Sequence, residues 1–248
     1  MIWWPLIVLC LNLSDIHLTC KLQFPETAAY FKAFLTECPA HNTPISVPDS
    51  LAERYLHECS STALTAADEY HLLHLVISSA LLPYRRCLFH GTAFLWQGRA
   101  WLFSAPSGTG KTTQFKQWRA LYRNEVRILN GDKPILEFMP DGQIMVHPSP
   151  WKGKERWGSM LKAPLAGIIY LEQGKENTIT RLTPQEAVIP IYKQFLYLPE
   201  KEEHIRVVCR LEDALLRNIP VWKLVNLGDL DSARLTHDVL LKYLEDNV

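Results

Sequence analysis

A glycine-rich segment that ends in lysine and threonine, APSGTGKT at positions 105–112, has the residue types that hold a triphosphate. Gly108 and Gly110 let the backbone curl so that its N–H groups approach phosphate oxygens. Lys111 has the length to reach the β- and γ-phosphates, and the Thr112 hydroxyl suits a Mg²⁺ ion bound with them. The segment therefore predicts a binding site for ATP and Mg²⁺.

The sequence on either side of this segment supports the same interpretation. An apolar run, Arg99 to Ser104, predicts a strand before it, and Phe115, Trp118 and Leu121 recur at helical spacing after it. Ala105 stands where the strict phosphate-loop pattern has its first glycine, and the alternative is a glycine-rich turn that happens to precede a lysine. The predicted nucleotide contacts in the segment are Ser107, Gly108, Thr109, Gly110, Lys111, Thr112 and Thr113.

Several sequence blocks, taken in order, resemble one protein family. They read LFHG, WLFSAPSGTGKTT, LNGDKPIL and PSPWKGKE, and they lie between Asp68 and Leu171. They are similar to the HPr kinase/phosphorylase family, and more narrowly to its small bacterial members, some of which phosphorylate a serine of a precursor peptide. The resemblance implies an α/β fold with a mixed sheet, of the phosphoenolpyruvate carboxykinase-like type, with antiparallel strands before the phosphate loop.

The resemblance also implies roles for residues outside the loop. His90 resembles the family histidine that pairs with the catalytic aspartate, and Asp132 resembles one of two adjacent aspartates, a general base and a Mg²⁺ ligand. Gly131 stands where the other aspartate is expected. Asp132 or His90 would then take the acceptor's proton, and both are predicted catalytic residues together with Lys111. From the residues alone, the alternative for His90 is a buried strand residue, and the alternative for Asp132 is a residue of an Asn130-Gly131 hairpin turn.

The block WKGKER at positions 151–156 places four charged residues around a glycine. By the resemblance, Lys154 and Arg156 join the nucleotide contacts and neutralise the transferring phosphoryl group, while Glu155 completes a metal site with Thr112 and Asp132. The alternative is a solvated loop, which runs of charge usually form. We expect Trp151 to be a packing residue and Lys133 to be a surface lysine.

Composition limits the classes of partner. Lysine and arginine total 26, as do aspartate and glutamate, so no overall field draws the 248-residue chain to nucleic acid or to a membrane. The six cysteines, including Cys10 and Cys38, lack metal-ligand spacing and are expected to be unpaired. The apolar start has no basic region or cleavage site, so we expect a cytoplasmic protein rather than a secreted one.

The element pattern divides the chain into an N-terminal accessory region, 1–62, and a nucleotide-binding kinase domain, 63–248. In the first part we predict strands at 6–13 and 16–24, a helix at 27–38 and a loop at 39–50. In the second part we predict a helix capped by Thr65 and ended by Pro83. The later predicted strands are 87–96, 99–104, 126–129, 134–139, 143–147, 165–172 and 221–227, and the later predicted helices are 112–122, 184–198, 211–218 and 232–244.

The sequence thus indicates a kinase that transfers the γ-phosphoryl group of ATP to a hydroxyl, preferably a serine of a peptide or small protein. One alternative is a kinase for a polyol or another small metabolite. The other is a nucleotide-binding regulatory module of weak activity, which the glycine at position 131 favours. Assembly of identical copies is compatible with the sequence.

Overall fold

The computed structural model describes residues 7–38 and 44–247, and the fold is built around one large mixed sheet. Hydrogen-bonded neighbours run in the order β11-β3-β7-β8-β9-β5-β4-β6, and β9 also pairs with β12, which pairs with β10. The strands are β3 (Arg86–Phe89), β4 (Gly91–Trp96), β5 (Arg99–Ser104), β6 (Arg127–Asn130), β7 (Ile135–Phe138), β8 (Ile144–His147), β9 (Ala163–Gln173), β10 (Thr178–Arg181), β11 (Phe195–Leu196) and β12 (Val221–Asn226). The prediction of an α/β fold with a mixed sheet is confirmed.

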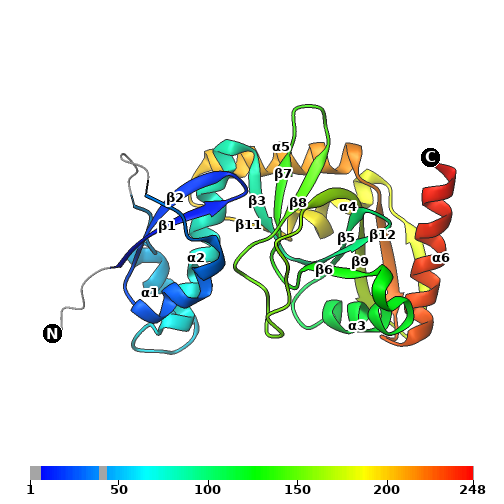
Figure 1. Ribbon diagram of the computed structural model, residues 1–248, viewed down its shortest axis with the longest axis horizontal. Helices are drawn as coiled ribbons and strands as arrows, with labels where there is room; N and C mark the ends of the chain where they lie inside the picture. Colours follow the sequence, from blue (N-terminus) through cyan, green and yellow to red (C-terminus); the bar gives the residue numbers. More distant parts are fainter. Residues whose placement is uncertain (1–6, 39–43, 248) are drawn as a thin grey trace.

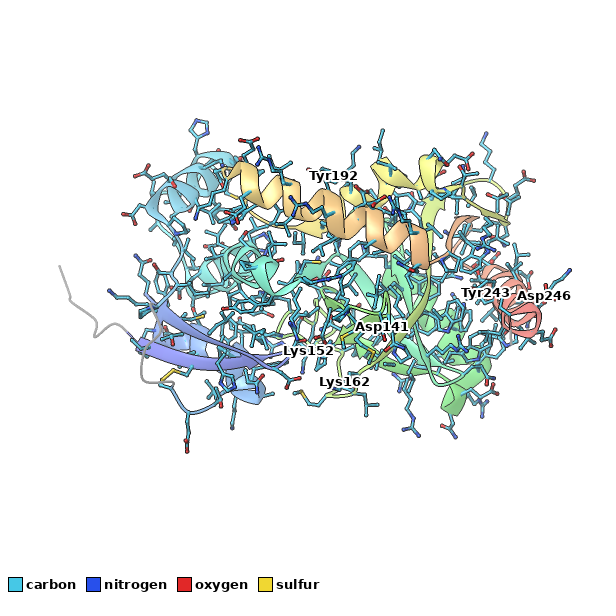
Figure 2. The ribbon with its side chains drawn as sticks, turned by 90° about the horizontal axis from the view of Figure 1, so that it is seen from above. Asp141, Lys152, Lys162, Tyr192, Tyr243 and Asp246 are labelled. Carbon is cyan, nitrogen blue, oxygen red and sulfur yellow. A yellow bond between two sulfur atoms is a disulfide. The ribbon has the colours of Figure 1, made fainter. Side chains whose placement is uncertain are left out.

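Helices cover both faces of this sheet (Figure 1). The helices are α1 (Asp49–Glu58), α2 (Ala66–Leu81), α3 (Lys111–Tyr122), α4 (Pro184–Tyr192), α5 (Glu202–Asn218) and α6 (Leu230–Asp246), and the 3₁₀ segments are η1 (Pro25–Phe34), η2 (Leu82–Tyr84) and η3 (Arg123–Glu125). Figure 2 shows α5 along one side of the molecule and α6, with Tyr243 and Asp246, at the end away from the N-terminal hairpin. Among the described residues, no helix has the length and apolar character needed to cross a membrane.

Strand β5 lies between two apolar layers and carries the chain to the candidate site. It pairs antiparallel with β4 and parallel with β9. Trp101 and Phe103 belong to the cluster that packs against α3 and α6, whereas Leu102 belongs to the cluster that packs against α4 and α5. Because both faces are buried, the strand reads as a continuous apolar run. This packing fixes the place where β5 ends and the glycine-rich segment begins.

The N-terminal elements form a third layer against α2. Strands β1 (Ile7–Leu13) and β2 (Ile16–Leu22) pair antiparallel, and their apolar side chains share a core cluster with Leu73 and Ile77 of α2 and with Trp151. The buried Glu69 of α2 accepts hydrogen bonds from the backbone of Gln23 (2.6 Å) and from the Thr27 hydroxyl (2.7 Å). The helix is thereby joined to the start of η1. The division at residues 62 and 63 stays a prediction.

Three sequence expectations about the N-terminal part differ from the structure. Cys10 and Cys38 form a disulfide, because the chain after η1 returns to β1, where the Thr36 N–H donates to the Cys10 carbonyl at 2.9 Å. Residues 25–34 form a 3₁₀ helix that ends at Phe34, where a longer helix is expected. The predicted loop at 39–50 overlaps α1, which begins at Asp49 after Pro48; residues 39–43 and Leu6 lie outside the described residues.

Later elements follow the predicted order with several differences. The helix capped by Thr65 is confirmed, with the Thr65 and Asp68 side chains each accepting from the other's backbone N–H. The strand expected at 87–96 is interrupted at His90 into β3 and β4. The helix expected to reach residue 198 ends at Tyr192, two residues after Pro190, and its remainder forms β11. Strand β10, which is short and mostly exposed, and the first half of α5 are not predicted.

Candidate functional site

The segment between β5 and α3 forms a tight loop whose shape depends on glycine. Gly108 has φ 80° and Gly110 has φ 112°, which are left-handed conformations that glycine adopts without a steric penalty. Gly110 is the residue before the first turn of α3. The loop therefore presents the N-terminus of a helix, with its unpaired N–H groups and positive dipole end, at the carboxyl end of β5.

Lys111 folds back across this loop. Its Nζ donates hydrogen bonds to the carbonyls of Ala105 (2.9 Å) and Pro106 (3.1 Å), and only 8% of the residue is exposed. Burial lowers the pKa of the Lys111 ammonium to about 8, although the nearby Asp132 carboxylate opposes this shift. An ammonium held in this way beneath a helix N-terminus is suited to neutralise an anion at the loop.

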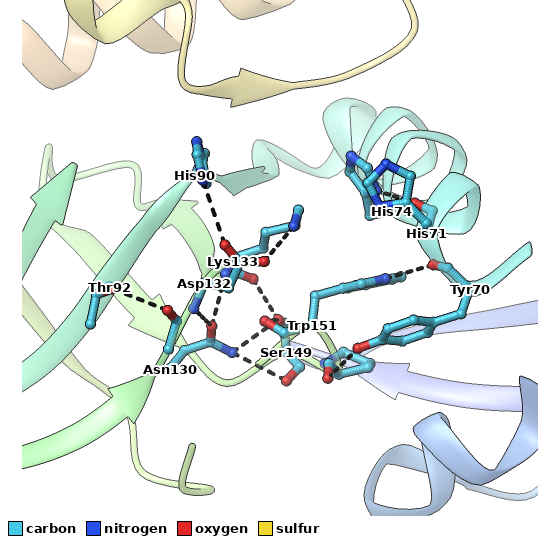
Figure 3. Close-up of polar contacts among 12 residues, drawn as sticks. Tyr70, His71, His74, His90, Thr92, Asn130, Asp132, Lys133, Ser149 and Trp151 are labelled. Carbon is cyan, nitrogen blue, oxygen red and sulfur yellow. Dashed lines mark hydrogen bonds and ion pairs between the residues drawn. The ribbon is translucent and has the colours of Figure 1, made fainter. Parts of the chain in front are cut away.

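Asp132 is held in place by the buried side chain of Asn130. The Asn130 Oδ1 accepts hydrogen bonds from the backbone N–H groups of Asp132 and Lys133, both at 2.9 Å. Its Nδ2 donates to the Ser149 Oγ at 3.0 Å (Figure 3). Because Asn130 is fully buried, these bonds fix the backbone that carries Asp132. The sequence predicts only a turn residue at Asn130; the available signal is a polar residue directly after the apolar pair Ile128-Leu129.

The position of Gly131 explains why no carboxylate stands there. A Cβ atom at this position would lie 2.5 Å from the Lys152 carbonyl oxygen and 3.1 Å from that of Trp157. The Gly131 N–H donates to the Trp157 carbonyl at 2.9 Å, and its own carbonyl accepts from the Thr92 hydroxyl at 3.0 Å. The backbone is therefore clamped from both sides, and the structure has no room for the aspartate that the resemblance implies.

His90 reaches the same carboxylate from the junction of β3 and β4. Its Nε2 lies 3.5 Å from the Asp132 Oδ1, and its backbone is held by Gln194 and Ser104, each at 2.8 Å. Burial and the positive charge of Lys111 lower the pKa of the His90 imidazole to about 4, although Asp132 opposes this. The imidazole is therefore neutral at neutral pH, and the contact with Asp132 is not between two full charges.

Lys133 is not the surface residue that we expect from the sequence. Its side chain is only 14% exposed, and its ammonium contacts the Asp132 Oδ2 (Figure 3). On the α2 side, His71 and His74 face the same space, and burial lowers the pKa of both, that of His74 to about 3. The sequence offers no signal for these residues, because they reach the site only through the packing of α2.

The charged residues of the block 151–156, which follows β8, differ in their relation to the cavity. Lys154 and Glu155 line the cavity, and the Glu155 Oε1 lies 3.6 Å from the Nζ of Lys116 on α3. Arg156 has φ 52°, is exposed and is not one of the described residues that line the cavity. Trp151 is buried, and its Nε1 donates to the Tyr70 carbonyl at 2.9 Å, as the packing prediction requires.

Together these segments enclose a cavity of about 650 Å³. Of the predicted site residues, those that line it are His90, Ser107, Gly108, Gly110, Lys111, Thr112, Thr113, Asp132, Lys154 and Glu155. Thr109 and Arg156 are not among its lining residues, because the Thr109 hydroxyl turns back to the Pro106 carbonyl at 3.0 Å and Arg156 lies on the exposed part of its loop. The cavity joins the glycine-rich loop to the Asp132 carboxylate.

The donor atoms at this cavity fit Mg²⁺ that arrives with a phosphate. Among the described residues, no group of three or more histidine, cysteine, aspartate or glutamate side chains gathers to hold a metal by itself. The cavity offers the Thr112 hydroxyl and the carboxylates of Asp132 and Glu155. Mg²⁺ is usually bound in this manner, through one or two carboxylates together with substrate phosphates and water.

No protein-family model matches the chain, and no curated protein matches it. Among solved structures, the protein is similar to the HPr(Ser) kinase/phosphatase from Coxiella burnetii. The two chains are 10% identical, the similarity covers 64% of this chain and 94% of the other, and the TM-score is 0.39. At this distance the activity must be argued from the residues of the protein itself.

Proposed function

We propose that the protein is an ATP- and Mg²⁺-dependent kinase that transfers the γ-phosphoryl group to a hydroxyl, preferably a serine of a peptide or small protein. The observation that carries this proposal is the convergence of three separate segments on one cavity. Lys111 comes from the start of α3, His90 from the junction of β3 and β4, and Asp132 from the turn after β6. A phosphate-binding end and a carboxylate base are the two parts that phosphoryl transfer to a hydroxyl needs.

In this proposal the loop and α3 bind the triphosphate. The backbone N–H groups of Ser107 to Thr112 contact phosphate oxygens. The Lys111 ammonium, which donates to the Ala105 and Pro106 carbonyls in the structure, donates to the β- and γ-phosphates instead when the nucleotide binds. Lys154, which lines the same cavity, neutralises charge on the transferring group. Thr112, Asp132 and Glu155 would hold Mg²⁺, which would supply charge neutralisation of the phosphates.

Asp132 takes the proton from the acceptor hydroxyl, and His90 positions it. The carboxylate is fixed by Asn130 through its backbone and by His90 and Lys133 through its two oxygens. His90, with its pKa lowered to about 4, is a weak base, and as a neutral ring it has one N–H that can donate to the Asp132 carboxylate. This assigns the base to Asp132 and leaves His90 as a positioning residue.

The decisive experiment is transfer of label from γ-labelled ATP with Mg²⁺ to serine peptides. We expect label on the peptide with the wild-type protein and none with Lys111→Ala. Equal label with both proteins contradicts the kinase assignment. Binding of ATP without transfer to peptides or to small alcohols would instead favour the regulatory module, which the closed space around Gly131 makes a specific alternative.

A further inference from the structure

A second cavity, of about 710 Å³, borders α3 beyond the candidate catalytic site. Three arginines surround it: Arg119 near the end of α3, Arg123 at the start of η3 and Arg127 at the start of β6. All three residues are exposed. Arg123 also has φ 39° and ψ −105°, a conformation that is uncommon for a residue other than glycine.

The three guanidinium groups lack counter-charges within the part of the chain that the structure describes. None of them has a hydrogen bond, ion pair or aromatic contact with the described residues, and no aspartate or glutamate in that part of the chain lines the cavity. Several other arginines do pair with carboxylates: Arg54, Arg86, Arg206, Arg217 and Arg234. Since the protein has no net charge, a cluster of unpaired positive groups around one concave surface indicates an anionic partner.

The arginine cavity and the catalytic cavity share two walls. One wall is α3, which contributes Lys111 to the catalytic cavity and Arg119 to the other. The second wall is the segment 153–161, with Lys154 lining the first cavity and Ser159 the second. Arg119 lies eight positions after Lys111 in the helix, a distance of about 12 Å along the axis. An extended peptide covers this distance with about four residues.

We propose that the arginine cavity binds an acidic segment of the acceptor polypeptide while its serine lies beside Asp132. This inference rests on the proposed kinase function. It assigns a preference for aspartate or glutamate about four residues from the serine, because the planar fork of arginine pairs with carboxylates. The cavity has the size of a site for a drug-sized ligand, and it therefore has room for more than one acidic side chain.

The test measures peptide binding separately from turnover. The probe is a fluorescently labelled synthetic peptide with one serine and an acidic run about four residues away, and its matched control has asparagine and glutamine in the run. Fluorescence anisotropy is measured for the wild type and for the triple variant Arg119→Gln, Arg123→Gln, Arg127→Gln. The control variant is Arg210→Gln, because Arg210 is exposed on α5 and has no partner among the described residues.

We expect the triple variant to bind the acidic peptide at least about tenfold more weakly than the wild type. The control variant and the neutral peptide should show no change, and added salt should weaken only the acidic peptide. Lys111→Ala should still bind the acidic peptide without labelling it. A wild-type protein that binds the acidic peptide but transfers no label to it would refute the kinase function alone. Equal binding of acidic and neutral peptides, or unchanged binding by the triple variant, overturns the proposal. So does arginine-dependent binding of inorganic phosphate without binding of the peptide.

Discussion

Replacing Gly131 by aspartate restores the carboxylate that the family resemblance implies, yet we expect it to damage the protein. The Cβ atom would lie 2.5 Å from the Lys152 carbonyl oxygen, whereas ordinary contacts begin at 3.4 Å, so 3.4 − 2.5 = 0.9 Å of space must open. Both neighbouring oxygens belong to the backbone, and the hydrogen bonds of Gly131 to Trp157 and Thr92 oppose the movement. Overpacking of this kind costs about 1–3 kcal/mol.

Thermal unfolding followed by circular dichroism measures this cost. A loss of about 1 kcal/mol lowers the melting temperature of a chain of this size by about 2–4 °C. We expect Gly131→Ala and Gly131→Asp both to melt lower than wild type, and phosphoryl transfer to fall because Asp132 is displaced with its neighbour. The control is Gly98→Asn, since Gly98 has φ 69°, a Cβ atom there would have no neighbour within 4 Å, and asparagine tolerates that conformation. An unchanged melting temperature for Gly131→Ala, or a higher kcat for Gly131→Asp, would refute the reasoning.

The charges and covalent bonds of the structure lead to four further predictions. Asp132→Asn is expected to lower kcat by about 10²- to 10⁴-fold with little change in melting temperature, and an unchanged kcat would exclude it as the base. Because burial and Lys111 lower the pKa of His90 to about 4, the pH profile of kcat/KM should show no histidine inflection near about pH 6.5. An inflection at that pH that disappears in His90→Gln would contradict the conclusion that His90 is neutral at neutral pH. Burial raises the pKa of Glu212 from 4.5 to about 7, so between these pH values the folded protein binds more protons than the unfolded chain. The stability of the wild type relative to Glu212→Gln should therefore fall as pH rises from 4.5 to about 7. Denaturant titrations of the two proteins over this pH range test the prediction, and equal pH dependence would disprove it. Cys38→Ser removes the Cys10–Cys38 disulfide, whose residues are 28 apart in sequence, and should lower the free energy of unfolding by about 3–4 kcal/mol. A thiol reductant should destabilise the wild type but not this variant.

Features that depend on neighbouring residues were predictable from the sequence. The turn-forming glycines 108 and 110 and the helix that follows them are local, because left-handed backbone and helix initiation are decided within a few residues. The helix start at Thr65 is local for the same reason, since its capping partner is Asp68. By contrast, the start of η1 is hydrogen-bonded to Glu69 of α2, a contact between residues more than 40 positions apart that no local pattern predicts.

The sequence by itself determined the residue types typical of a phosphate-binding loop and a short set of polar residues for a candidate site, and the family resemblance implied an α/β fold with a mixed sheet. Only the tertiary structure decided which of them share a cavity. It placed Asp132 between His90 and Lys133, moved Arg156 and Thr109 out of the lining, and closed the space at Gly131. The physical reason is that these contacts join strands, helices and loops far apart in the chain, so packing and buried hydrogen bonds set them rather than local conformational preference.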